Sequence, residues 1–146
     1  MPESGNRNVE PSTYNGQRSK NGADARQGFD LEERLLDYAA TVIRFTEKLP
    51  HSRAANHIAG QLLRSGTSPL PNHAEAQAAE SRDDFIHKLS ICLKELRESR
   101  RWFKLIERVP LSRETRTVTA MVAETEELIR IFAKSIKTAK AGRTER

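Results

Sequence analysis

Apolar positions recur every three or four residues along successive segments of the chain, which is the spacing of one face of an α-helix. The first such segment extends from Asp30 to about Leu49. Asp30 is placed as an N-cap, with Glu33 at capping-box spacing, and Pro50 ends the helix. The predicted buried positions are Leu31, Leu35, Tyr38, Ala39, Val42, Phe45 or Thr46, and Leu49.

The second predicted helix starts near Ser52 and contains an irregular stretch, residues 65–72. This stretch holds one glycine and two prolines, and each proline lacks the backbone donor that a helix needs. We therefore predict a kink or a break there. The alanine-rich residues 74–79 favour a return to helix, so both pieces belong to one layer.

Two longer amphipathic segments follow. Ser81 is placed to open a helix that reaches Arg108, and Ser112 is placed to open another that reaches about Lys140. No segment alternates apolar and polar residues over the length of a strand. The pattern predicts an all-α protein, an antiparallel up-and-down four-helix bundle with a kinked second helix.

The two ends of the chain differ in composition from the predicted bundle domain, residues 29–141. Residues 1–28 are rich in Asn, Gly, Ser, Gln and Arg, and predict a flexible N-terminal arm, which is either a solubilising leader or a weak basic tether. Residues 142–146 form a basic C-terminal tail. Because no apolar run is typical of a signal peptide or a membrane span, we expect a cytoplasmic protein without membrane contact.

The net charge of +5 is concentrated in the C-terminal half of the chain. Residues 82–110 and 111–146 each carry a net charge of +3, whereas residues 29–81 carry −2. Cations of the third helix fall within an arc of about 80° over roughly four turns. Such a line of charge predicts sequence-tolerant, salt-sensitive binding of RNA or DNA. The predicted nucleic-acid-binding residues are Lys94, Arg97, Arg100, Arg101, Lys104 and Arg108.

A solvated helix face is the alternative interpretation of this basic stripe. Glu98 and Glu107 lie about one turn from Arg101 and Lys104, where they are able to form weak surface ion pairs. The lysines and arginines of residues 134–146 either extend the basic surface or complement the dipole of the last helix.

The third helix also carries a second group of apolar residues outside its core stripe. This group consists of Ile91, Trp102, Leu105 and Val109, which lie on the opposite side of the basic stripe from the core. Because a monomeric bundle needs only one buried stripe per helix, the group predicts a subunit interface and self-association.

Enzymatic chemistry is not indicated by the sequence. His51, His57, His73 and His87 lack the spacing of a helical metal site, and each is expected at the surface or at a cap. The single cysteine, Cys92, falls in the core stripe, where a thiol is a poor nucleophile. No glycine-rich phosphate loop occurs. We expect no catalytic residue, no cofactor and no metal.

Several strings of the chain carry a resemblance to a known family. The chain reads IAGQLLRSGTS over residues 58–68, followed by Asn72, by EAQ over residues 75–77, by DFIHKLS over residues 84–90 and by LKE over residues 93–95. This pattern resembles the four-helix bundle proteins known as 23S rRNA intervening-sequence proteins. The resemblance implies a homopentamer without catalytic residues. It also implies kinship with the accessory protein of diversity-generating retroelements, which binds nucleic acid and pairs with a reverse transcriptase.

Residues 68–72 depart from the pattern of that family. They read SPLPN, where members usually have Ser-Ile-Gly-Ala-Asn or Ser-Ile-Pro-x-Asn, so we expect a stronger bend than in a typical member. Asn72 and Glu75 form a polar pair three residues apart on one helix face. We expect this pair to satisfy backbone groups freed at the kink or to meet a neighbouring subunit.

These observations predict a non-enzymatic homo-oligomer, by resemblance a pentamer, that presents a basic surface to RNA or DNA. The alternative is a protein-binding accessory subunit, for example of a reverse transcriptase or a ribosomal assembly, that does not itself contact nucleic acid. The sequence leaves both open, since a basic surface suits a polyanion and an acidic protein alike.

Overall fold

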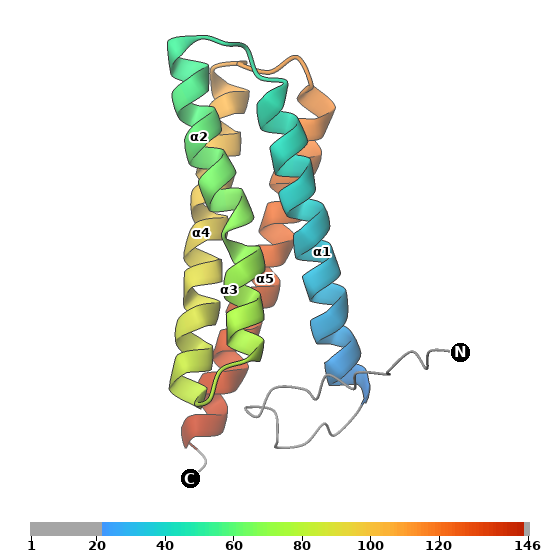
Figure 1. The fold of residues 1–146 in the computed structure, drawn as a ribbon, viewed down its shortest axis with the longest axis vertical. Helices are drawn as coiled ribbons and strands as arrows, with labels where there is room; N and C mark the ends of the chain where they lie inside the picture. The colour runs from blue at the N-terminus through green and yellow to red at the C-terminus, as the bar shows by residue number, and fades with distance from the viewer. Residues whose placement is uncertain (1–21, 145–146) are drawn as a thin grey trace, which may run out of the picture.

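The computed structural model describes the backbone of residues 22–144 and the side chains of residues 30–142. The helices are α1 (Gly22–Glu47), α2 (Arg53–Thr67), α3 (Pro69–Gln77), α4 (Arg82–Arg108) and α5 (Thr115–Thr144). The described residues contain no strand. Figure 1 shows α2 and α3 as two parts of one bent rod, so the helices form four antiparallel rods. The predicted all-α bundle with a bent second helix is confirmed.

The N-terminal caps of two helices follow the expected serines. The Ser52 hydroxyl accepts a hydrogen bond from the backbone N–H of Ala55 at 3.1 Å, and the Ser81 hydroxyl accepts one from the N–H of Asp84 at 3.1 Å. Each bond satisfies a backbone donor that the first turn of a helix leaves free. Ser52 and Ser81 therefore fix where the second and third rods begin.

The predicted start of the first helix was wrong. Because α1 begins at Gly22, Asp30 lies within this helix and is not its N-cap. Alanine, arginine and glutamine are good helix formers, and residues 22–28 contain all three, although the segment lacks large apolar residues. Of the predicted arm, residues 1–28, the first 21 residues lie outside the described part of the chain.

The bend between α2 and α3 lies at Ser68, which keeps right-handed helical backbone angles of φ −60° and ψ −38°. Its N–H still donates to the Arg64 carbonyl at 3.1 Å. Pro69 and Pro71 follow, and neither has an N–H to donate to the preceding turn. The rod therefore loses bonds of its ladder at this point and bends, as Figure 1 shows.

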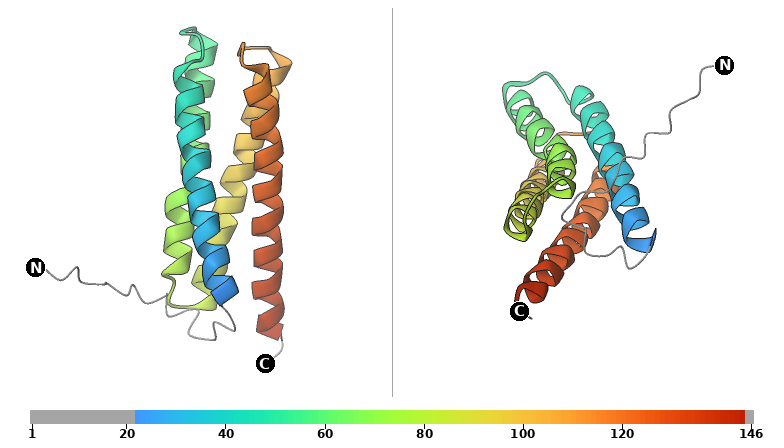
Figure 2. Two further views of the ribbon diagram at one scale, coloured as in Figure 1. Left: turned by 90° about the vertical axis from the view of Figure 1, so that its right-hand side faces the viewer. Right: turned by 60° about the horizontal axis from the view of Figure 1, so that its bottom comes forward.

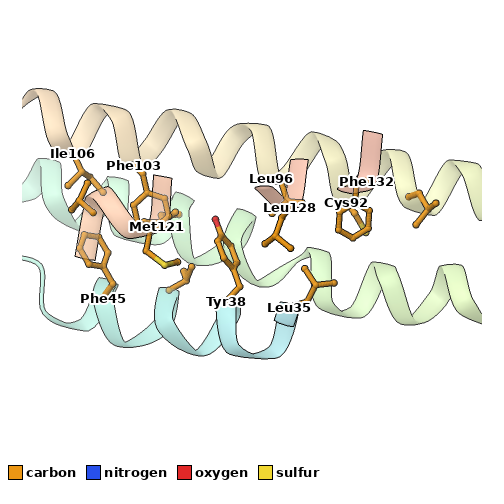
Figure 3. Packing of buried hydrophobic residues seen from close by; sticks show 14 of the residues in the cluster. Leu35, Tyr38, Phe45, Cys92, Leu96, Phe103, Ile106, Met121, Leu128 and Phe132 are labelled. Carbon is orange, nitrogen blue, oxygen red and sulfur yellow. The ribbon is translucent and has the colours of Figure 1, made fainter. Parts of the chain in front are cut away.

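The hydrophobic core runs along the length of the bundle. Figure 3 shows side chains from facing helices pointing into the space between them. Phe45 and Phe103 pack with ring centroids 5.5 Å apart. The largest apolar side chains that are almost fully buried are Leu35, Val42, Leu62, Leu96, Phe103, Ile106, Leu128 and Phe132.

A layer of buried hydroxyl groups interrupts this apolar core. The Tyr38 hydroxyl lies 2.6 Å from Thr125 Oγ1, and Ser65 Oγ lies 2.8 Å from Ser99 Oγ. Burial raises the pKa of Tyr38 to about 12, against smaller opposing effects of its hydrogen bonds with Thr125 and Ser99. The four residues come from α1, α2, α4 and α5, so the buried hydroxyl layer joins four helices.

Close packing of α1 against α2 depends on Gly66. A Cβ atom at this position would lie 2.8 Å and 2.9 Å from the two methyl carbons of Val42. Val42 is fully buried, so its methyl groups have little room to move. The glycine thus permits the two helices to approach closely.

Candidate nucleic-acid interface

An open groove between α4 and α5 collects part of the predicted basic stripe. Lys94, Arg97 and Arg101 line it from α4, and Lys140 lines it from α5. The groove has a volume of about 430 Å³, and its other lining residues are Ser90, Leu93 and Ile136. All four cationic side chains are exposed. We call these four residues the groove cations.

The register of α4 against α5 brings the groove cations together. Lys94, Arg97 and Arg101 are separated by three and four residues, so they share one face of α4. Lys140 lies one turn beyond Ile136, which is buried against the core. Figures 1 and 2 show α4 and α5 side by side along the rods, with the C-terminal part of α5 next to the N-terminal part of α4.

Two members of the predicted stripe are neutralised by carboxylates. Arg100 Nε lies 2.9 Å from Glu126 of α5, and Lys104 Nζ lies 3.7 Å from Glu107. Exposed pairs of this kind stabilise a fold by less than about 1 kcal/mol, yet they reduce the charge available to a ligand. Arg108 lies in the last turn of α4, where a cation complements the helix dipole.

The groove cations, in contrast, form no ion pair with any carboxylate of the described residues. Other basic side chains bridge the rods instead: Arg34 pairs with Glu124 at 2.7 Å, and Arg64 pairs with Glu95 at 3.0 Å. The groove therefore collects four exposed cations that have no ion-pair partner among the described residues. The sequence alone did not reveal that Lys140 joins the three cations of α4.

The predicted interface residues of α4 do not share one environment. Leu105 and Val109 are 38% and 51% exposed. Trp102 is partly buried against the core, and its ring meets His57 of α2 edge-on at 6.2 Å between centroids. Its indole Nε1 is buried without a hydrogen-bond partner. Ile91 is also partly buried. The sequence-based interpretation missed the contact of Trp102 with α2.

A further apolar stripe lies on α1 and was not predicted. Leu36 and Ile43 are 47% and 46% exposed, and they are seven residues apart, which places them on one face of the helix. Ala40 lies between them and is partly buried. The signal was present in the sequence as apolar residues adjacent to the core positions of the same helix.

The polar pair at the bend is divided between two roles. Asn72 Nδ2 donates to the Ser68 carbonyl at 2.9 Å and contacts its hydroxyl at 3.0 Å. Glu75 forms an ion pair with Lys88 of α4 at 2.7 Å. Asn72 thus serves the backbone at the bend, whereas Glu75 ties α3 to α4.

The histidines and the cysteine offer no reactive constellation. His73 is buried, contrary to its predicted surface position, and lies edge-on to Phe132. Its Nδ1 has no hydrogen-bond partner, and burial lowers the pKa of the imidazole. Burial raises the pKa of the Cys92 thiol to about 12, which disfavours the nucleophilic thiolate. Within the described residues, no three His, Cys, Asp or Glu side chains are grouped to hold a metal.

None of the described helices combines the length and the apolar character needed to cross a membrane.

Comparisons with known proteins agree with the fold. The family model described as 23S rRNA-intervening sequence protein matches residues 30–134. No curated protein matches the chain. A similar solved structure is a protein of unknown function from the S23 ribosomal protein family of Bacteroides thetaiotaomicron. It is 31% identical, with a TM-score of 0.67, and the match covers 75% of this chain and 97% of that one. The chain belongs to the 23S rRNA-intervening sequence protein family.

Proposed function

We propose that this protein is a non-enzymatic, cytoplasmic, homo-oligomeric bundle that binds RNA or DNA without sequence preference. The observation that carries the proposal is the set of four groove cations, which have no carboxylate partner among the described residues. Arg100, Lys104 and Arg108, predicted from the sequence, do not line the groove, and Arg100 and Lys104 are paired with carboxylates.

Phosphate contact is the chemistry that this arrangement supports. Lysine and arginine side chains neutralise phosphates and release condensed counterions, which is a sequence-independent source of affinity. The groove lining offers no fixed array of polar groups that would read base edges, since its uncharged members are one serine and two aliphatic residues. Binding should therefore be tolerant of sequence and strongly weakened by salt.

The family supplies a second line of support. Its description associates its members with intervening sequences of 23S rRNA. The matched residues 30–134 contain three of the groove cations, Lys94, Arg97 and Arg101, whereas Lys140 lies beyond the match in α5. Nucleic acid is thus the polyanion that best fits both the exposed groove cations and the description of the family.

Self-association is supported by the exposed apolar side chains. Leu36 and Ile43 on α1, and Leu105 and Val109 on α4, each present a pair of large hydrophobic residues to solvent. Such pairs are typical of subunit contacts. We propose a homopentamer, on the resemblance to the family, and multi-angle light scattering of the purified chain measures the number of subunits directly.

The test of nucleic-acid binding is a charge reversal with a matched control. We expect Arg97→Glu with Arg101→Glu to abolish binding of a labelled oligonucleotide in fluorescence anisotropy. The control is Arg113→Glu with Arg116→Glu, which makes the same change of charge at exposed positions that do not line the groove. Arg116 and Lys140 are separated by roughly 36 Å of helix. Equal loss in both variants would show that net charge, and not the groove, governs binding.

A protein-binding accessory subunit is the second candidate, favoured by the α1 stripe. Leu36 and Ile43 give this helix an exposed apolar face far in sequence from the groove cations. A partner such as a reverse transcriptase or a ribosomal assembly would then bind without any contact between this chain and nucleic acid. Wild-type protein that fails to bind any oligonucleotide at low salt would favour this candidate.

A further inference from the structure

The groove has two unlike sides and an aliphatic floor. Lys94, Arg97 and Arg101 stand on the α4 side, whereas Lys140 stands on the α5 side. The apolar lining comes from Leu93 of α4, which is partly buried, and from Ile136 of α5, which is almost fully buried, and both offer hydrocarbon rather than hydrogen-bonding groups. The groove is therefore suited to a ligand backbone that carries anionic groups at its edges and less polar groups between them.

The spacing of the cations corresponds to a single backbone. From Lys94 to Arg101 the axis of α4 rises by about 10.5 Å. One strand of a double helix advances about 3.4 Å along the duplex axis for each phosphate and winds round that axis, so neighbouring phosphates on the backbone lie further apart and this distance covers fewer than about three of them. Lys140 lines the same groove from α5.

On these observations, and resting on the function proposed above, we propose that the groove holds one sugar–phosphate ridge of a double helix and disfavours single strands. In a duplex the bases are already stacked and turned inward, so the groove needs to contact only phosphates and sugars. The cations then meet the phosphates, and the partly buried Leu93 contacts the sugars.

The position of the aromatic residues supports this choice. Proteins that bind single strands commonly stack successive bases on aromatic side chains. Among the residues lining the groove none is aromatic. Elsewhere in the described chain, four aromatic residues are buried in the core, Phe85 is partly buried against it, and Trp102 lies against α2; the four are Tyr38, Phe45, Phe103 and Phe132. A single strand would find cations here but no surface for its bases, and it would also lose the freedom of its flexible chain.

The experiment compares a mixed-sequence duplex with each of its component strands. Full-length protein is titrated into each labelled oligonucleotide at the same low salt concentration, and anisotropy gives the dissociation constants. We expect the duplex to bind at least about tenfold more tightly, and added salt to weaken its binding with the steep dependence of phosphate contacts. Equal or tighter binding of the single strands would overturn the duplex proposal while supporting nucleic-acid binding. Failure of all three oligonucleotides to bind would overturn the proposed function itself.

A variant of one groove cation tests whether a preference for duplexes comes from the shape of the groove or only from the higher charge density of duplexes. Lys140→Gln removes the cation on the α5 side, and Arg116→Gln removes one exposed cation elsewhere on α5. We expect Lys140→Gln to weaken duplex binding more than single-strand binding and to lower the slope of log K against log salt by about 0.9 for each groove engaged. Arg116→Gln should leave the preference unchanged. If Lys140→Gln keeps the full duplex preference, charge density alone explains it and the groove proposal fails.

Discussion

Gly66 provides a direct test of the packing between α1 and α2. Replacing it by alanine places a Cβ atom 2.8 Å from one methyl carbon of Val42 and 2.9 Å from the other, well inside van der Waals contact. Val42 is fully buried, so relief requires a shift of the helices or an unfavourable rotamer. Gly60, in the same helix, is the matched control, because a Cβ atom there meets nothing within 4 Å.

Two opposing effects set the size of the stability change in Gly66→Ala. Alanine in place of glycine favours a helix interior by about 0.5–1 kcal/mol. Overpacking of a filled core costs typically 1–3 kcal/mol. Gly60→Ala should therefore stabilise the fold by about 0.5–1 kcal/mol, whereas Gly66→Ala should destabilise it by roughly 1 kcal/mol net, with a spread set by how far Val42 yields. The two variants should differ by about 2 kcal/mol.

Urea unfolding followed by far-ultraviolet circular dichroism measures this difference. All variants are compared at one protein concentration, because self-association would make stability depend on it. Val42→Ala in the Gly66→Ala background removes the clashing methyl groups, so the double variant should lose less stability than the sum of the single variants. A Gly66→Ala protein as stable as Gly60→Ala, or strictly additive effects with Val42→Ala, would refute the close approach of α1 and α2 as the role of Gly66.

Three other changes probe the interior. Tyr38→Phe removes a buried hydroxyl bonded to Thr125, and we expect a loss of about 0.5–1.5 kcal/mol in urea unfolding. Burial lowers the pKa of His73 from its ordinary 6.5, so the unfolded chain binds a proton first as the pH falls. The free energy of unfolding is therefore unaffected by His73 above about pH 6.5 and falls as the pH drops below this value, because the unfolded chain is protonated first. His73→Leu should flatten the measured pH profile of stability below about pH 6.5. Cys92, with its pKa raised to about 12, should react with a thiol reagent only as fast as the protein opens, so mild urea should accelerate the reaction.

The four rods and the bend could be predicted from the sequence because local signals specify them. Helical periodicity, the serines at positions 52 and 81, and the two prolines after Ser68 each act within a few residues of the feature that they determine. The start of α1 was missed because residues 22–28 have helix-forming side chains but no apolar stripe. Helix propensity, and not hydrophobic periodicity, was the relevant signal in residues 22–28.

The candidate site was only partly predictable, since its composition depends on contacts between helices. The face shared by Lys94, Arg97 and Arg101 follows from their spacing. The pairing of Arg100 with Glu126, and the arrival of Lys140 beside the groove, depend on how α4 and α5 are aligned. A helical wheel of one segment carries no information on that alignment.

Two aromatic side chains are buried where the sequence analysis did not expect it. Trp102 lies outside the core stripe of α4, yet α2 covers part of its ring. His73 is three residues before the fully buried Ala76 and four residues after the buried Pro69, so helical spacing on α3 would have predicted its burial. The polar character of histidine favours the surface, whereas its helical position favours the core, and in the structure the position decides.

The buried hydroxyl layer has a consequence for the groove on the outside of the protein. If α4 slid along its neighbours by one turn, about 5.4 Å, the Ser99 hydroxyl would leave its Ser65 partner and face hydrocarbon. The leucines above and below would tolerate the same slip far better, since their contacts are not directional. The buried hydroxyl groups thus fix the register of α4 along the neighbouring helices. Because Tyr38 is also hydrogen-bonded to Thr125 of α5, the buried hydroxyl layer as a whole fixes which residues of α4 and α5 line the groove together.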